Sequence, residues 1–419
     1  MPLKNLGVRS YTMKIMKAYR FRLEPTEAQR QLFVEFAGCR RFVWNKMLAL
    51  NLQRLWDKQL IMRYNESTWW LTFWKRSDEF GFLATAQSQV LQQTLKDLDG
   101  AFTDAFDRKQ PLKRIPKFKK KGVGDSFRFP QSVKVDGNRV FLPKIGWVPM
   151  RLSRQIEGSV RSATVSRRES HWFISILNSR EIAEPIHGSS TASGIDRGVV
   201  KLATLSDGSI FEGSKPLKRL AKRLAREQRE LVRKTKFSNN WKKQRDRVSR
   251  LHIRIADARN DEIHKATTII SKNHAVIVLE DLHTKNMTAS AKGTVDEPGS
   301  KIRKKAGLNR SILDMGWYEF HRQLEYKQRW RGGQVILINP RNTSRRCSVC
   351  GFTDKANRTT QSQFSCMACG HSENADVNAA KNILAAGLCR DEACGGIGDL
   401  APDEAGTGGA VMQPLPLAA

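Results

Sequence analysis

The chain has 419 residues, which is too many for one ordinary hydrophobic core and indicates two to four domains. Its 73 Lys and Arg residues against 41 Asp and Glu residues give a net charge of +32, so a polyanion is the expected partner. An anionic membrane is the alternative polyanion. However, no apolar run approaches the roughly 20 residues of a membrane span, and no signal peptide is visible. The basic residues are spread along the chain, which favours nucleic acid over a single lipid-binding patch.

The first third of the chain alternates between strand and helix patterns. Residues 13–23 alternate basic and apolar side chains, which predicts a strand with one exposed basic face. Pro25 and Thr26 interrupt that pattern, and a helix follows with Glu27 in its first turn. Helical spacing returns between Trp69 and Phe106, and we interpret the tryptophans there as core residues rather than a stacking platform.

A basic loop rich in proline and glycine, RKQPLKRIPKFKKKGVGDSFRFP, separates these helices from a β-rich region. VKVDGNRVFLP predicts a hairpin that turns at Asp136–Gly137–Asn138, and RSATVSRRESHWFISILNS predicts a second hairpin. A small polar linker, residues 186–194, then precedes a change in character. SGIDRGVVKLATLSDGSIFEG predicts a hairpin that turns at Asp207–Gly208.

The remaining chain predicts a mixed α/β sheet with helices packed on it. The pattern indicates two charged helices in 216–272 broken near KFSNN, a buried strand in HAVIVLEDL, a loop at 288–307, a helix in ILDMGWYEFHRQLEYKQRW and a strand in GGQVILINP. The tail from about Gly387 is rich in Gly, Ala and Pro, and we expect it to be disordered.

Four of the seven cysteines form two CxxC pairs, Cys347/Cys350 and Cys366/Cys369, separated by 15 residues. This spacing is typical of a four-thiolate zinc ribbon made from two short knuckles. Cys39 lies in an apolar helical segment and is expected to be a core residue. Cys389 and Cys394 are expected to be free thiols, because the cysteine pattern favours a reducing cytosol with bound zinc over a disulfide framework.

Three carboxylates stand out by position. Asp196 lies in the middle of the apolar stretch GIDRGVVKLATL, which we read as one strand, Glu280 ends AVIVLE, and Asp376 opens the helix-like ADVNAAKNIL. A carboxylate in a buried strand is costly unless it is paired or binds metal, and three together would repel one another unless divalent cations neutralise them. Two Mg²⁺ ions about 4 Å apart would also support phosphodiester hydrolysis. The alternative is three unrelated residues: a turn or cap, a helix-entry acid and an N-cap or first-turn residue.

The segments GIDRGVVKLATLSDG, VIVLEDLHTKNM, NTSRRCSVCG and FSCMACGHSENADVNAAKNIL together resemble the TnpB (OrfB) proteins of bacterial insertion sequences, which are related to type V CRISPR effectors. YRFRLEPTEAQ, GCRRFVWN and PKFKKK also match, so the resemblance covers most of residues 13–386. The tail beyond Leu384 and the loop 288–307 depart from the family pattern.

The resemblance implies a multidomain α/β fold: an RNase H-like RuvC nuclease domain with an inserted zinc ribbon, and an N-terminal wedge β-barrel with an inserted helical recognition domain. By this resemblance, the chain divides into a wedge-like barrel at 1–24 and 127–185, a recognition domain at 25–126, a RuvC-like domain at 190–345 and 372–386, a ribbon at 346–371, and a tail at 387–419. The carboxylates Asp196, Glu280 and Asp376 match the three acidic positions of RuvC.

Several basic or aromatic positions are candidates for nucleic-acid contact, and a solvated surface is the alternative for each. For Phe118, among the lysines of the central loop, we weigh base stacking against core packing. The candidates are Tyr19, Arg20, Arg22, Lys117, Lys119, Lys120, Lys121, Lys222, Arg223, Lys242, Lys243 and Arg358.

The resemblance implies an RNA-guided DNA endonuclease that cuts double-stranded DNA beside a short adjacent motif. The expected cofactors are structural Zn²⁺, catalytic Mg²⁺ and a transposon-encoded guide RNA, and no membrane partner is expected. A cytoplasmic, nucleoid-associated location in a bacterium or archaeon is expected. The alternatives are a strand-transferring DNA transposase, since an RNase H-like fold supports either chemistry, and a nuclease-silent RNA-guided DNA-binding protein.

Overall fold

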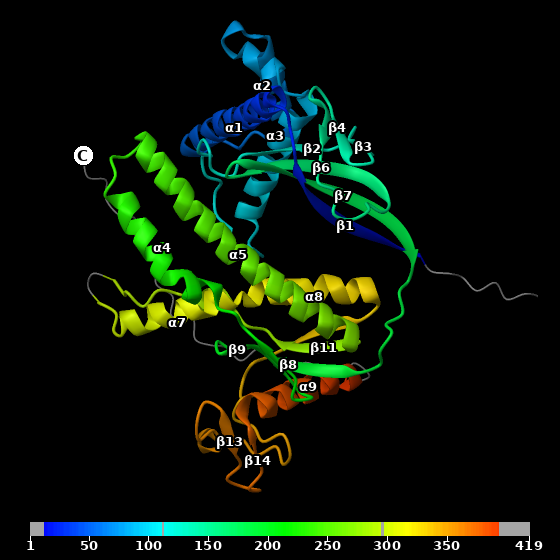
Figure 1. Cartoon of the computed structure of the whole chain (residues 1–419), viewed down its shortest axis with the longest axis vertical. Coiled ribbons are helices and arrows are strands. Elements are labelled where there is room, and N and C mark those ends of the chain that lie inside the picture. Colours follow the sequence, from blue (N-terminus) through cyan, green and yellow to red (C-terminus); the bar gives the residue numbers. More distant parts are fainter. Residues whose placement is uncertain (1–11, 111–112, 295–296, 394–419) are drawn as a thin grey trace, which may run out of the picture. The chain divides into compact units, whose positions relative to one another are not determined.

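The computed structural model describes residues 12–110, 113–294 and 297–393 (Figure 1). The chain forms two compact units, one made of 1–185 and 224–252 and the other of 186–223 and 253–419. Residues 224–252 therefore group with the N-terminal unit, whereas we expected 190–345 to belong to one domain. Within the described ranges, no helix is long and apolar enough to cross a membrane.

The first unit contains a four-stranded antiparallel sheet in the order β1-β7-β6-β2. Its strands are β1 (Thr12–Leu23), β2 (Ser126–Phe129), β6 (Ser159–Arg168) and β7 (His171–Ala183). A second sheet contains β3 (Lys134–Asp136), β4 (Arg139–Leu142) and β5 (Gly146–Pro149). These strands confirm the predicted N-terminal strand and both predicted hairpins. The described strands form two sheets, and their closure into one barrel stays a prediction.

Three α-helices follow β1 in the chain: α1 (Glu27–Trp56), α2 (Tyr64–Arg76) and α3 (Ser88–Phe106), with the short 3₁₀ helix η1 (Asp78–Ala84) after α2. Helix α1 begins where expected, because the Thr26 side chain accepts a hydrogen bond from the Gln29 amide and the Gln29 side-chain oxygen accepts one from the Thr26 amide. The tryptophan prediction holds for Trp74, which is 2% exposed, but Trp69 is 63% exposed.

The second unit contains a five-stranded mixed sheet in the order β10-β9-β8-β11-β12. Its strands are β8 (Ala192–Asp196), β9 (Lys201–Leu205), β10 (Ile210–Glu212), β11 (Val276–Glu280) and β12 (Gln334–Ile338). The central pairs β8–β11 and β11–β12 are parallel, and β9 runs antiparallel to both β8 and β10. This mixed sheet confirms the predicted α/β architecture of the C-terminal half.

The stretch GIDRGVVKLATL is two strands, so the prediction that Asp196 lies in the middle of one strand is wrong. Asp196 is the last residue of β8, and residues 197–200 turn the chain into β9. The side chain of Arg197, the first residue of this turn, is buried and donates a hydrogen bond to the backbone carbonyl of Glu280.

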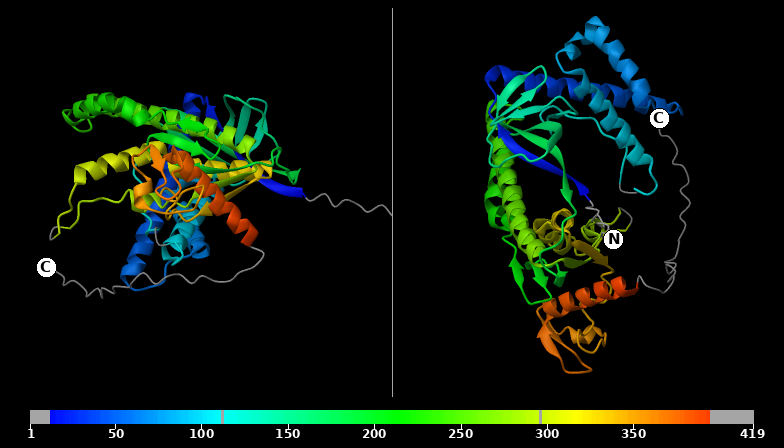
Figure 2. Two further views of the ribbon diagram at one scale, coloured as in Figure 1. Left: turned by 90° about the horizontal axis from the view of Figure 1, so that it is seen from below. Right: turned by 90° about the vertical axis from the view of Figure 1, so that its right-hand side faces the viewer.

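Helices cover both faces of this sheet (Figures 1 and 2). On one face, Ile195, Ile277 and Leu279 pack with residues of α5 (Asn239–Asn273) and α8 (Trp317–Arg331). On the other face, Val278 packs with Ile383 of α9 (Ala375–Ala393). Side chains alternate along a strand, so Gly194, Asp196, Val278 and Glu280 face α9.

Gly194 allows α9 to lie directly on β8. A Cβ atom at this position would lie 2.2 Å from the carbonyl oxygen of Ala380 and 2.5 Å from the amide nitrogen of Leu384, both on α9. Only glycine permits so close an approach of two backbones. The glycine before Ile195 therefore determines how near the last helix comes to the sheet.

The remaining helices are α4 (Pro216–Val232), α6 (Thr284–Met287) and α7 (Ile302–Met315). Helices α4 and α5 confirm the predicted break near KFSNN. The helix predicted in ILDMGWYEFHRQLEYKQRW divides into α7 and α8 at Gly316, which has φ +69°. Two loop predictions are corrected: residues 302–307 belong to α7, and 387–393 continue α9 instead of beginning a disordered tail. Cys394 and the rest of the predicted tail lie outside the described residues.

Candidate active site and zinc site

The parallel pairing of β8 and β11 brings two of the candidate carboxylates together. Ile195 pairs with Leu279, so the next residues, Asp196 and Glu280, are neighbours at the carboxyl ends of the two strands. In an open α/β sheet, ligands bind at the carboxyl ends of parallel strands. Both side chains face α9, so they lie beside each other although their positions are 84 residues apart in the sequence.

The third carboxylate, Asp376, lies in the first turn of α9. The Asn374 side-chain oxygen accepts hydrogen bonds from the Asp376 and Val377 amides, so the helix has another N-terminal cap. Asp376 is therefore not the N-cap, but the other part of that alternative, a first-turn position, is what the structure shows. Its carboxylate lies 3.6 Å from the Lys201 ammonium and 3.7 Å from the Arg358 guanidinium.

Burial and neighbouring negative charge both act on the carboxyl group of Asp196. Burial raises the pKa of Asp196 from its ordinary 3.8 to about 7, with added contributions from the charges of Glu280 and Asp376. Burial also raises the pKa of Glu280, while a hydrogen bond from Thr343 and the charge of Arg197 oppose that rise. A divalent cation relieves both the burial of a carboxylate and its repulsion by neighbouring negative charges.

The three carboxylates do not form a closed ligand cage. Among the described residues, the one group of three or more His, Cys, Asp or Glu side chains whose ligand atoms all lie within 4.8 Å is the cysteine cluster. The ionic contacts of Lys201 and Arg358 with Asp376, together with the buried Arg197, place three cationic side chains around the three carboxylates. Oxygen donors of this kind suit Mg²⁺, which is commonly held by one or two carboxylates and water.

Several residues around this site were not predicted from the sequence. Thr343 donates a 2.6 Å hydrogen bond to Glu280, and Arg197 donates to its backbone carbonyl. Asn378 and Asn382, one turn apart on α9, both donate to the Arg346 carbonyl. The i, i+4 spacing of these asparagines in VNAAKN is the only sequence signal that points to them.

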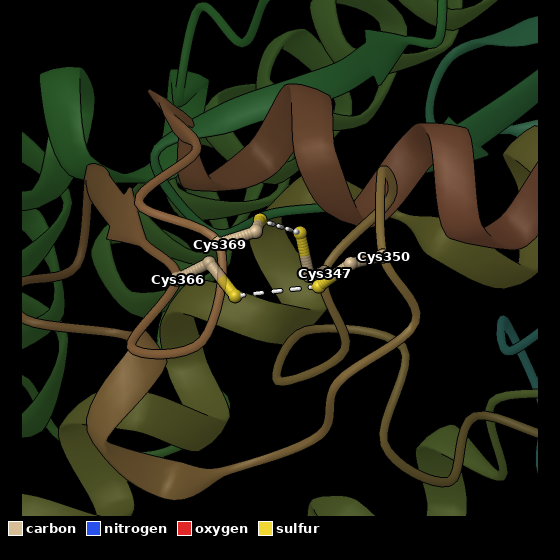
Figure 3. Close-up of side chains that lie close together, drawn as sticks. All are labelled: Cys347, Cys350, Cys366 and Cys369. Carbon is tan, nitrogen blue, oxygen red and sulfur yellow. Dashed lines mark hydrogen bonds between the residues drawn. The ribbon is translucent and has the colours of Figure 1, made fainter.

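The four predicted zinc ligands meet at one point (Figure 3). The Sγ atoms of Cys347 and Cys369 are 3.8 Å apart and those of Cys350 and Cys366 are 3.6 Å apart. Sulfurs about 2.3 Å from a central zinc form a tetrahedron with edges of about 3.8 Å, which is far longer than a disulfide bond of about 2.0 Å. The cluster therefore fits a tetrahedral Zn²⁺ ion.

Each knuckle has the same backbone turn. The Gly351 amide donates to the Cys347 carbonyl and the Gly370 amide to the Cys366 carbonyl, both at 3.0 Å. Both glycines have positive φ, 77° and 72°, which other residues rarely adopt. The hairpin of β13 (Gln363–Ser365) and β14 (Ser372–Asn374) carries the second knuckle and continues into α9.

Two neighbouring polar residues of the ribbon, Asn357 and Arg358, have different surroundings and different roles. Asn357, at the end of the 3₁₀ helix η2 (Lys355–Asn357), is fully buried and donates to the Arg345 and Phe352 carbonyls. It holds the ribbon together. Arg358 is half-buried and faces Asp376, so the ribbon contributes one of the cations beside the carboxylates.

The three nucleic-acid candidates near the N-terminus differ in how exposed their side chains are. Tyr19 is 2% exposed and packs in the core, so the prediction that it contacts nucleic acid is wrong. Arg20 is exposed, with its guanidinium 4.5 Å from the Phe173 ring, and Arg22 is half-buried. Side chains alternate between the two faces of β1, and this places Tyr19 on the core face. The basic–apolar alternation of the sequence already indicated that placement.

The central lysines form a basic strip, residues 117–120, whose backbone is fixed on α1. Trp44 donates to the Lys117 carbonyl at 3.1 Å, and Asn45 both donates to and accepts from the Lys119 backbone at 3.0 and 2.8 Å. Phe118 is 53% exposed, so its alternative as a core residue is wrong.

Lys119 differs from the other lysines of the strip. Its ammonium lies 3.6 Å from the centre of the Trp44 ring, and burial, with the charge of Arg40, lowers its pKa to about 8. The remaining basic candidates are all solvent-exposed: Lys117, Lys120, Lys121, Lys222, Arg223, Lys242 and Lys243.

Three family models match the chain. The OrfB_IS605 model, described as a probable transposase, matches residues 173–291, and the Cas12f1-like TNB domain matches 317–383. A model described as a helix-turn-helix domain matches 13–57, where this chain forms a strand and one long helix.

The chain is similar to curated proteins over nearly its whole length. It is 50% identical over 377 residues to the putative RNA-guided DNA endonuclease InsQ of Escherichia coli K12, covering 90% of this chain and 93% of that protein. It is 33% identical over 388 residues to a putative RNA-guided DNA endonuclease of Streptomyces pristinaespiralis, covering 91% and 92%. A shorter match, 44% over 75 residues, is to the endodeoxyribonuclease Cas12f1 of Sulfoacidibacillus thermotolerans, covering 18% of each chain.

The fold is also similar to a solved effector structure. A cryo-EM structure of the Cas12f1–sgRNA–target DNA complex matches with a TM-score of 0.52 and 13% identity, covering 88% of this chain and 98% of the matched one. The fold and its zinc-ribbon-like cluster are thus those of a multidomain α/β RuvC-type effector. Within that class, the chain belongs to the TnpB family, the OrfB proteins of IS605-type insertion sequences.

Proposed function

We propose that this TnpB-family chain, an RNA-guided DNA endonuclease, cuts DNA in one RuvC-like centre made of Asp196, Glu280 and Asp376. The observation that carries the proposal is the convergence of these carboxylates on the α9 face of the sheet, at the carboxyl ends of β8 and β11. The two relatives matched over most of their length support the reaction class, since both are named putative RNA-guided DNA endonucleases.

The same three side chains would hold Mg²⁺, which supplies charge neutralisation at the phosphate and a nucleophilic water. The residues of the chain have separate roles around it. Asp196 would release its proton as the cation binds, because burial first, and the charges of Glu280 and Asp376 second, raise its pKa to about 7 when no cation is there to offset them. Lys201 and Arg358 now neutralise Asp376, and on cation binding they would turn toward the DNA phosphates.

The basic strip supports the proposed contact with nucleic acid. Its backbone is already fixed by Trp44 and Asn45, so little conformational entropy is lost when a phosphate backbone binds. The exposed Lys117, Phe118 and Lys120 offer two charges and one ring for stacking. The guide RNA would be transposon-encoded, and the target would carry a short adjacent motif.

We assign the cysteine cluster to structural Zn²⁺, because four thiolates leave no open coordination position for catalysis. The ribbon would then act by holding two groups near the centre. It carries Arg358, and its hairpin leads directly into the helix that bears Asp376.

The test begins with expression of the protein beside its native flanking DNA, followed by sequencing of the copurified RNA. One dominant RNA whose 3′ part extends beyond the element boundary is expected, and it supplies the guide for cleavage assays. Asp196→Ala should abolish cleavage while RNA and target binding are retained, and Asp261→Ala, at an exposed α5 position, should cleave normally. Cleavage by Asp196→Ala would refute the centre, and joined DNA ends instead of double-strand breaks would favour a strand-transferring transposase.

A further inference from the structure

The carboxylate of Glu280 has a specific buried partner. Thr343, which is 8% exposed, donates a hydrogen bond of 2.6 Å from its Oγ1 to Oε1 of Glu280. Within the part of the chain that the structure describes, no other side chain donates to this carboxylate. The Pro340 carbonyl, 3.1 Å from the same hydroxyl, is the more distant acceptor.

Thr343 is itself held in place by a residue of α9 in the second unit. The side-chain amide of Asn382, on α9, donates to the Thr343 carbonyl at 2.9 Å and to the Arg346 carbonyl at 2.6 Å. Asn382 is 7% exposed, so water competes little for these hydrogen bonds. The same helix carries Asp376. A continuous set of buried contacts therefore joins Glu280, at the end of β11, to the helix that bears the third carboxylate.

We propose that Thr343 is a positioning residue for the divalent cation, acting through the orientation of the Glu280 carboxylate. The proposal rests on the carboxylate centre described above. A hydroxyl donor on one oxygen fixes the rotation of a buried carboxylate and favours its ionised form. Asn382 then keeps that donor in register with α9, so Glu280 and Asp376 stay at a defined separation. Partners of this kind commonly change metal affinity or activity about 10- to 100-fold.

Two substitutions separate positioning from simple packing. Thr343→Val keeps the volume of the side chain but removes the hydroxyl, and Thr343→Ser keeps the hydroxyl but removes a methyl group. If Thr343 only fills space, serine should be the more damaging change. If it positions Glu280, valine should be the damaging change and serine should restore function.

The first measurement is the Mg²⁺ concentration that gives half-maximal single-turnover cleavage by the protein–guide RNA complex. We expect Thr343→Val to need about tenfold more Mg²⁺ or more, and Thr343→Ser to stay within about threefold of the wild type. Binding of guide RNA and target should be unchanged in both variants. A wild-type Mg²⁺ requirement in Thr343→Val would overturn the proposal, as would a loss of rate that no Mg²⁺ concentration alters.

The second measurement does not depend on activity: Mn²⁺ bound by the full-length chain, followed by electron paramagnetic resonance. The affinity of Thr343→Val for Mn²⁺ should be lower than that of the wild type by about tenfold or more. Equal binding would count against positioning. Glu280→Gln is the reference for the centre itself. If Glu280→Gln still cleaves DNA, the proposed centre fails. If Glu280→Gln is inactive but Thr343→Val behaves as wild type, only the role of Thr343 fails. Should the valine variant not fold, Thr343→Ala is read in the same way.

Discussion

The close contact between β8 and α9 makes Gly194→Ala a severe test of how the centre is built. The new methyl group would lie 2.2 Å from the Ala380 carbonyl oxygen, whereas ordinary contacts begin at 3.4 Å. Both neighbouring atoms belong to helix backbone, so α9 must move by about 1 Å, and overpacking of this kind commonly costs about 1–3 kcal/mol of folding stability.

The displacement matters for activity because α9 carries Asp376 while β8 carries Asp196. A misplacement of about 1 Å can reduce the rate of an enzyme about 100-fold. We therefore expect Gly194→Ala to bind guide RNA but to cleave about 100-fold more slowly in single-turnover assays, with a lower melting temperature.

Gly100→Ala is the matched control, because this α3 position has open space around it and an ordinary helical backbone. It should cleave normally and be slightly more stable, by up to about 1 kcal/mol. If Gly194→Ala cleaves within about threefold of the wild type, α9 does not depend on that contact, and the account of how Asp376 is placed is wrong.

Four further predictions concern the zinc cluster, the buried carboxylate, which gives two of them, and the basic strip. Replacing Cys347 and Cys350 with Ser should release zinc, measured by atomic absorption, and lower the melting temperature; an unchanged zinc content would exclude the site. Because Asp196, with a pKa of about 7, is about nine-tenths protonated at pH 6, the Mg²⁺ requirement should be about tenfold higher there than at pH 8. Without divalent cations, stability should decrease as pH rises from about 4 to 7, since the fold favours the protonated acid, and Asp196→Asn should remove that decrease in thermal scans. Lys117→Ala with Lys120→Ala should weaken RNA binding and reduce the slope of log affinity against log salt by about 1–2, whereas a surface lysine outside the strip should alter neither as much.

Local patterns in the sequence account for the individual elements. The basic–apolar alternation of 13–23 predicts β1, and the apolar run AVIVLE predicts β11. The CxxC spacing predicts the cysteine cluster, because knuckle geometry depends only on residues close in sequence. Position in or beside apolar segments singled out the three carboxylates from 41 acidic residues, and the resemblance to a family then matched them to one nuclease centre.

Contacts between distant residues explain what the patterns missed. In the turn after Asp196, Arg197 donates to the Glu280 carbonyl, which lies on a strand about 80 residues later, and no local pattern predicts that contact. Thr343 looks like an ordinary loop residue until β11 and α9 are placed beside it. The break at Gly316 could be read in either way, since glycine is tolerated inside helices as well as after them.

The ends of the ribbon lie side by side. Asn378, on α9 beyond the ribbon, donates to the carbonyl of Arg346, the first residue of the ribbon, at 2.8 Å and accepts from the Ser348 amide at 2.9 Å. A segment that leaves and re-enters a domain at neighbouring points can be replaced without rerouting the surrounding chain. The ribbon is therefore a natural place for modular exchange: a longer or shorter module could be grafted between Arg346 and Asn374, provided that it returns the chain to α9 at the same point.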